Sequence, residues 1–254
     1  MYFFFFRNNQ KPDELYPLSK ENQTQTYIKK EIIKKDEKTE IEPLLDIKLN
    51  NSDEKIRELL KNCSSEFEFT KWLKKEDLIR KFVAIVDNIS KGTTPTPHLE
   101  FLKPSNKFKV IFESGKIKID PICYKRYNIY SNVFTSLNTK ALVLRFKQLK
   151  PLIDEAYKEL GYPEEKFEEP LFEAFSILMN TPVVYGNIYL RKKIISFSFV
   201  DQKLEKLNAA QKHLLRMGPE NIKQIHTKLK EIAKEMGLQL NQLPQPKTYI
   251  PNRN

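Results

Sequence analysis

Eight polar residues lie among apolar helical segments, where they could form one binding pocket. Guanidinium groups and tyrosine hydroxyls gathered in such a pocket would hold an anionic ligand. The second interpretation is structural, with the same groups buried as hydrogen-bonded pairs that fix helix packing and loop caps. Isolated buried charges are costly, so partners are expected in either case. The residues are Arg80, Asp87, Asn88, Tyr124, Arg126, Tyr127, Arg216 and Asn221.

A basic surface is the second candidate. The chain has 44 Lys and Arg against 33 Asp and Glu, and residues 107–150 hold 10 basic and only 2 acidic residues. A basic face with interleaved Phe and Tyr is typical of surfaces that bind nucleic acid or another polyanion, although Lys, which outnumbers Arg here, gives generic attraction rather than base readout. The alternative is a solvated surface that keeps the protein soluble. The expected basic face comprises Lys107, Lys109, Lys116, Lys118, Lys125 and Lys147.

The scarce residue types exclude most recognisable catalytic motifs. The 6 glycines are too scattered for a phosphate-binding loop, and the 3 histidines include no pair spaced four residues apart. Cys63 and Cys123 are far apart in sequence, whereas zinc ligands usually come in short local spacings. Two small apolar core residues are the simpler interpretation of these cysteines, and a disulfide would require an oxidising compartment. We therefore predict no catalytic residue, no metal site and no cofactor.

Helices must position most of these residues. Apolar side chains recur at helical spacing from Ile56 to Cys63, from Leu78 to Ile89, over 168–180, and from Pro219 to about Met236. A helix capped by Asn138 or Thr139 should be kinked or divided by Pro151.

Strands are fewer than helices. Alternating residues over 108–119, around Ser114-Gly115, predict a β-hairpin whose alternate lysines share a face. Segments 183–190 and 194–200 are rich in β-branched and aromatic residues and are typical of two further strands. The predicted fold class is α+β and predominantly helical, a single compact multi-helix domain with one or two β-hairpins.

The chain divides into three parts. Residues 1–50 join the apolar start MYFFFF to a polar stretch without sustained apolar spacing, which indicates a flexible linker. Residues 51–238 form the domain, with Ser52 as its first helix cap, and residues 239–254 are expected to be a loose tail. Six apolar residues are fewer than a membrane helix or signal peptide needs. MYFFFF is thus either a short apolar tag or the end of an anchor that begins before Met1.

Several blocks resemble the bacterial family called domain of unknown function (DUF) 3014. They are LIRKFVAIVDNISKG (78–92), YKRY (124–127), KALVLRFKQLKPLIDEAYKELGYP (140–163) and AQKHLLRMGPENIKQIHTKLKEI (210–232), with Pro97-His98-Leu99 between the first two. The resemblance covers about residues 43–237. It implies no particular activity. It does imply a common architecture of one N-terminal membrane helix, a polar linker and this domain outside the cytoplasm, from which the short MYFFFF departs.

Three functions remain open at this stage. The leading expectation is a non-enzymatic interaction or scaffold domain of the bacterial cell envelope, anchored in the inner membrane through its N-terminus and binding an envelope protein. The first alternative is a cytoplasmic binder of nucleic acid or another polyanion that uses the basic face of residues 107–150. The second alternative is an enzyme whose class has no recognisable motif.

Overall fold

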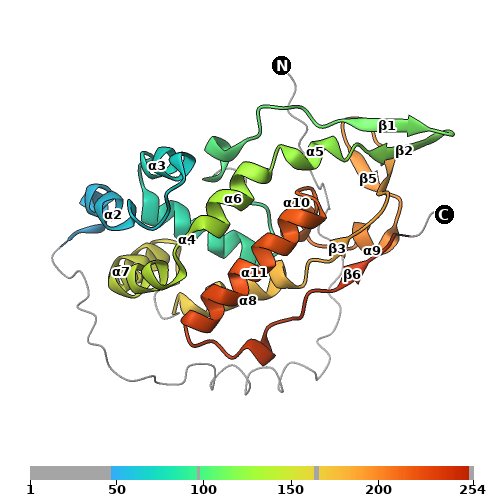
Figure 1. Cartoon of the computed structure of the whole chain (residues 1–254). Coiled ribbons are helices and arrows are strands. Elements are labelled where there is room, and N and C mark those ends of the chain that lie inside the picture. The colour runs from blue at the N-terminus through green and yellow to red at the C-terminus, as the bar shows by residue number, and fades with distance from the viewer. Residues whose placement is uncertain (1–46, 96–97, 163–165, 252–254) are drawn as a thin grey trace.

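The computed structural model of the protein describes residues 47–95, 98–162 and 166–251. MYFFFF, the polar sequence up to residue 46 and Pro97 of the resemblance lie outside these residues. The described chain is predominantly helical with a small antiparallel sheet, which confirms the predicted α+β class. Figure 1 shows the helices gathered together and the sheet at one edge of the molecule.

Four longer helices enclose the main core. α4 (Leu78–Ser90) packs on α8 (Glu168–Met179) and on α7 (Thr139–Glu159), and α11 (Pro219–Glu235) packs on α7 and α8. Val83, Phe167 and Ile222 are wholly buried among them. Removing such apolar surface from water is the main stabilising contribution to a core. The shorter helices are η2 (Leu49–Asn51), α2 (Asp53–Leu60), α3 (Phe67–Leu73), η4 (Glu100–Leu102), α5 (Ile122–Lys125), α6 (Asn128–Ser136), α9 (Gln202–Glu205), α10 (Ala209–Leu215) and η5 (Leu240–Gln242).

Local signals place several helix starts. The Asn138 side chain accepts a hydrogen bond from the Ala141 backbone N–H at 2.9 Å, which caps α7 as predicted. Asn208 and Gln211 form a reciprocal capping box on α10. Of the two effects predicted for Pro151, a kink or a division, the division does not occur, because α7 continues through the proline. Buried side chains on both sides of the proline pack into the core, and that packing outweighs one lost backbone hydrogen bond.

The sheet has four strands in the order β1-β2-β4-β5, all antiparallel to their neighbours. The strands are β1 (Val110–Glu113), β2 (Lys116–Ile119), β4 (Tyr189–Lys192) and β5 (Phe197–Phe199). β2 is antiparallel to both β1 and β4, so β1 and β4 run in the same direction. The turn after β1 and the turn after β4 therefore lie at the same end of the sheet.

A second, parallel ladder corrects two sequence predictions. Val183 and Val184 form β3, which pairs with β6 (Thr248–Tyr249) rather than continuing into the β4–β5 hairpin. Residues 239–254 were expected to be a loose tail, yet Leu243 is buried and β6 closes this ladder. The physical reason is long-range: the backbone of β3 needs a partner strand, and only a distant segment supplies it. The limits of the domain itself stay predictions.

The expected linker also enters the fold before its predicted end. Residues 49–51 form η2, and Leu49 is buried in the core. Ser52 does not cap α2 with its side chain, because its hydroxyl donates to the Leu49 carbonyl oxygen instead. In the part of the chain described here, none of the helices combines the length and apolar character needed to cross a bilayer.

Candidate functional site

The eight polar residues singled out in the sequence do not form one pocket. Arg80 lies at the start of α4, and Asp87 with Asn88 lies near its end. The other five come from α5, α6, α10 and α11 and their connections, and most of them meet in one cluster.

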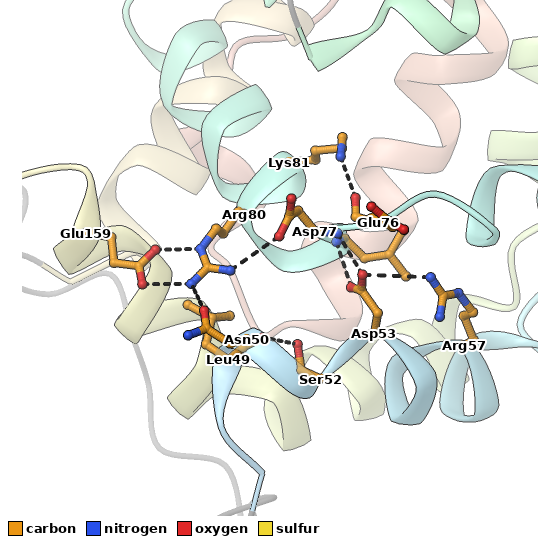
Figure 2. A network of polar contacts seen from close by, with 11 residues as sticks. Leu49, Asn50, Ser52, Asp53, Arg57, Glu76, Asp77, Arg80, Lys81 and Glu159 are labelled. Atoms are coloured by element: carbon orange, nitrogen blue, oxygen red, sulfur yellow. Dashed lines mark hydrogen bonds and ion pairs between the residues drawn. The ribbon is translucent and has the colours of Figure 1, made fainter.

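Arg80 lies in a polar network that joins the first helices to α4 and α7 (Figure 2). Its guanidinium forms a two-pronged ion pair with Glu159, with Nε–Oε2 and Nη2–Oε1 distances of 2.6 and 2.9 Å. Nη2 also donates to the Asn50 side chain, and Nη1 to Asp77. These contacts raise the pKa of Arg80 and lower that of Glu159, chiefly through their mutual hydrogen bonds. The network fixes helix positions and leaves Arg80 engaged on all three nitrogens.

Asp53 completes this network from α2. Its carboxylate accepts hydrogen bonds from the backbone N–H groups of Asp77 and Leu78, at 2.7 and 2.9 Å, and so caps α4 from a neighbouring helix. Arg57 lies within 3.7 Å of the same carboxylate and donates to the carbonyl oxygens of Leu73 and Lys75. Figure 2 shows these groups converging between helices, where their hydrogen bonds and ion pairs hold the helices together. We call this network the clasp; it comprises Asn50, Asp53, Arg57, Asp77, Arg80 and Glu159.

Asp87 and Asn88 serve the C-terminal end of α4. Asp87 pairs with Lys91 at 2.9 Å, and Lys91 also contacts the Tyr162 hydroxyl and covers its ring. The hydrogen bond that Lys91 donates to Tyr162, followed by the one it donates to Asp87, raises the pKa of Lys91. Asn88 donates to the Ala84 carbonyl and accepts from Thr93. Arg80 and Asp87 thus have separate partners, although both belong to α4.

Arg126 and its neighbours form the arginine cluster, which we define as Arg126, Tyr127, His213 and Arg216. The Arg126 guanidinium lies over the rings of Phe108 and Tyr127, 5.7 and 4.9 Å from their centroids. It donates to the Asn106 carbonyl and to the Tyr127 hydroxyl, both at 3.0 Å. Its Nε is buried without a hydrogen-bond partner among the described residues.

His213 belongs to the arginine cluster but carried no sequence signal beyond its residue type. Burial, followed by the charges of Arg216 and Arg126, lowers the pKa of His213 to about 4. Burial likewise lowers the pKa of Arg216, while Tyr127 and Glu205 act in the opposite direction. The histidine is therefore neutral at neutral pH, and two positive groups are held close together here. Glu205 also pairs with Lys212 at 3.3 Å.

The side-chain amide of Asn221 connects α11 to α5 and α6. Its amide nitrogen donates to the carbonyl oxygens of Met217 and Tyr124, at 2.7 and 3.2 Å, and to the Asn128 side chain. Its oxygen accepts from the Ser131 hydroxyl. Burial raises the pKa of Tyr124 to about 12. Asn221 is thus used in packing α11 against α5 and α6, as the structural interpretation expected of buried polar groups.

The described residues contain no group of three or more His, Cys, Asp or Glu side chains arranged to hold a metal ion. Cys63 and Cys123 are both buried free thiols. Burial raises the pKa of the Cys63 thiol. The Cys123 sulfur accepts from the Lys109 backbone N–H at 2.9 Å, so it supports the start of the hairpin.

The expected basic face is dispersed. Lys116 and Lys118 share one face of β2, and the register places Arg191 of β4 beside Lys116. Lys118 is paired with Glu113 at 2.5 Å, and Lys116 lies over the Tyr189 ring. The remaining members lie elsewhere: Lys107 and Lys109 before β1, Lys125 in α5 and Lys147 in α7. Whether these lysines bind a polyanion stays a prediction.

The sequence reasoning overlooked the exposed surface that two turns form together at the end of the sheet. Phe112, Ile194 and Ile195 lie there with 74%, 99% and 62% of their surface exposed. The three residues before the isoleucines, Arg191, Lys192 and Lys193, are exposed as well. The signal that could have revealed this surface is the run RKKII, in which apolar residues follow a basic triplet at an expected hairpin turn.

These features define a predominantly helical α+β domain whose candidate polar residues serve mainly as packing contacts. The chain belongs to the family described as "Protein of unknown function (DUF3014)", whose model matches residues 78–233, more than half of the sequence. Neither the search of curated proteins nor that of solved structures finds a match to this chain. The family match confirms the resemblance stated from the sequence.

Proposed function

We propose that the protein is a non-enzymatic interaction domain of the bacterial cell envelope, tethered to the inner membrane through its N-terminal segment. The observation that carries the proposal is the use of the candidate polar residues. Arg80, Asp87 and Asn221 are committed to nearby side chains and backbone carbonyls rather than directed into a common pocket. A catalytic site needs polar groups that converge on one reacting position.

The tether and the compartment rest on the resemblance. The architecture it implies places a membrane helix and polar linker before the domain, and residues 8–46 of this chain have a polar linker's composition. A polar linker of this length would let a tethered domain search several nanometres for its partner. A domain on such a linker is suited to binding a partner that lies at a distance from its anchor.

A reporter fused to the C-terminus of the natural protein, in its own bacterium, tests the compartment. We expect an exported-type reporter such as alkaline phosphatase to be active and a reporter that needs the cytoplasm to be inactive. In situ crosslinking from the domain surface would then retrieve envelope proteins. The reverse pattern of reporter activity would contradict the proposal.

The cytoplasmic polyanion binder remains the second candidate, favoured by Lys116, Lys118 and Arg191 on one face of the sheet. The pairing of Lys118 with Glu113 weakens that field. Affinity for duplex DNA that falls steeply with salt would support this candidate.

A further inference from the structure

The end of the sheet carries two turns side by side. The β1–β2 turn lies at Ser114-Gly115, and the β4–β5 turn spans residues 193–196, closed by a hydrogen bond from the Lys193 N–H to the Ser196 carbonyl at 2.8 Å. The pairing of Ile117 with Leu190 places these turns next to each other. In Figure 1 the β1–β2 hairpin extends away from the helices. We call residues 112–116 and 191–196 together the sheet tip.

The apolar residues of the sheet tip are unusual for their positions. Ile194 and Ile195 occupy the two central places of the turn, where Gly, Asn, Asp and Pro predominate. Leu190 and Phe199, the pair of the β4–β5 ladder furthest from the turn, are 6% and 7% exposed, whereas Ile194 is 99% exposed. The strands thus pass from the core to open solvent and end in apolar side chains that nothing in the described chain covers.

The charges of the sheet tip have one dominant sign. Arg191, Lys192 and Lys193 are exposed directly before the isoleucines, and Lys116 lies on the adjacent strand. The acidic member of the tip, Glu113, is paired with Lys118. Exposed aliphatic groups are therefore bordered by a net positive rim.

We propose that the sheet tip is a membrane-docking surface that inserts Ile194 and Ile195, with Phe112, into the headgroup region of an anionic lipid bilayer. Aliphatic side chains at a convex tip gain by leaving water for the acyl boundary, and the binding strength scales with that area plus attraction to anionic lipid. Lys and Arg side chains beside them extend to the phosphate level, where each adds electrostatic attraction.

The chemistry of the sheet tip favours a lipid surface over nucleic acid. Single-stranded nucleic acid is held by stacking on aromatic rings, and duplex readout depends on arginine forks. The sheet tip has one exposed ring, Phe112, and one arginine, Arg191, which is less than either mode of recognition uses. The isoleucines at the extreme of the turn would be left in water over a phosphate backbone. A projecting pair of turns also presents its apolar atoms outward, as entry into a fluid interface requires.

This inference goes beyond the proposed function and does not depend on the compartment, because an anionic bilayer presents the same chemistry on either side. Under the proposed tether, the sheet tip would give the domain a second, reversible contact with the membrane. The two proposals fail separately: the reporter fusion tests the compartment, and vesicle binding tests the sheet tip.

Vesicle binding by the purified full-length chain tests the inference. We expect binding to vesicles of phosphatidylglycerol mixed with phosphatidylcholine, weak binding to phosphatidylcholine alone, and a decrease as salt is raised. The double variant Ile194→Ser/Ile195→Ser should bind anionic vesicles with an affinity that is lower by about tenfold or by more than that. Lys192→Gln/Lys193→Gln should have a similar effect at low salt and a smaller one at high salt.

The matched control is Phe67→Ser, because Phe67 is 71% exposed but belongs to α3. It should bind as the unaltered chain does. MYFFFF is present in every variant, so a difference between variants reports on the sheet tip. Unaltered binding by the isoleucine double variant, or no binding to anionic vesicles by the natural sequence, would overturn the inference. DNA binding lost in the lysine variant but kept in the isoleucine variant would overturn it in favour of a polyanion surface.

A positional probe gives a second readout. An environment-sensitive fluorophore on Ile194→Cys should shift to shorter wavelength when anionic vesicles are added. The same label on Ile250→Cys, 73% exposed near the C-terminus, should not shift. Cys63 and Cys123 are buried, so labelling under native conditions should favour the introduced thiol. Equal shifts at both positions would contradict insertion by the sheet tip.

Discussion

The two arginine-centred regions hold their charges in different ways. Arg80 at the surface has a carboxylate partner, and its pKa is raised by the hydrogen bonds that it donates to Glu159. Arg126 has aromatic faces, a carbonyl and a hydroxyl, and no described carboxylate forms an ion pair with it. The pKa values of its neighbours Arg216 and His213 are lowered by burial. In the first region an opposite charge balances the arginine, whereas in the second region the arginine is held by packing against aromatic rings.

The largest effect should come from Gly218, which lies beside the arginine cluster. A Cβ atom there would lie 2.4 Å from the Tyr124 ring, and the φ of +84° disfavours side chains. We expect Gly218→Ala to lower the free energy of unfolding by about 3 kcal/mol or more, as overpacking and backbone strain add. Urea unfolding followed by circular dichroism measures this.

Gly115→Ala is the control for backbone strain alone. Its φ is +74°, but its Cβ would meet nothing within 4 Å. It should cost about 1 kcal/mol. Equal losses for the two variants would show that contact with Tyr124 is not what holds the region together.

The second effect is a pH dependence located at His213. Because its pKa falls from 6.5 to about 4 on folding, the unfolded chain binds the proton more readily. Stability should therefore decrease as pH falls from about 6.5 to about 4. His213→Gln should remove about 2 kcal/mol of that decrease, a figure reduced because the residue is partly exposed. Urea unfolding across this pH range gives both curves.

His226 supplies an internal check on that measurement. Burial also lowers its pKa, so the His213 variant should keep a residual decrease in the same direction. Parallel curves for the natural sequence and the variant would place the pH dependence outside the arginine cluster.

The smallest effect should come from the clasp. Glu159→Gln removes the charge that faces Arg80, and we expect a loss of about 1 kcal/mol or less, because both side chains are partly exposed. The pKa of Glu159 is lowered from 4.5, so its contribution is present above that pH and is lost as pH falls below it. The same unfolding assay at neutral and acidic pH measures the difference.

Glu220→Gln serves as the matched surface control. Its 3.7 Å pair with Lys223 lies within one helix turn and should contribute nothing measurable. A Glu159 effect as large as that of Gly218→Ala would mean that the clasp, not packing, dominates stability.

Sequence reasoning succeeded at several local signals, although Ser52, an expected cap, does not cap α2 with its side chain. Asn138 caps α7 with its own side chain, because a cap needs only the next few residues. The hairpin at 110–119 also followed from alternation around a glycine turn. The aliphatic faces of α4 and α11 were predictable from helical spacing for the same reason.

The candidate site was less predictable because its contacts are long-range. Nothing near Arg80 in sequence indicates Glu159 or Asn50 as its partners. Asp53 begins α2 but caps α4, a relation that exists only once the two helices meet. The pKa of His213 is lowered first by burial, which depends on tertiary packing, and then by the charges of Arg216 and the distant Arg126. The sheet tip required the order of strands, which alternation alone does not give.

The pairing of β3 with β6 determines how much of the chain is needed to complete the folded domain. The family match ends at residue 233, yet Thr248 and Tyr249 complete the backbone pairing of β3, and the Tyr249 hydroxyl donates to Asp201 at 2.6 Å. A fragment cut to the matched region would leave Val183 and Val184 as an open apolar strand edge, and α4 without its cap from Asp53. Open edges of this kind recruit other chains. The C-terminal segment outside the match therefore covers a strand edge that would otherwise be open to pairing with another chain.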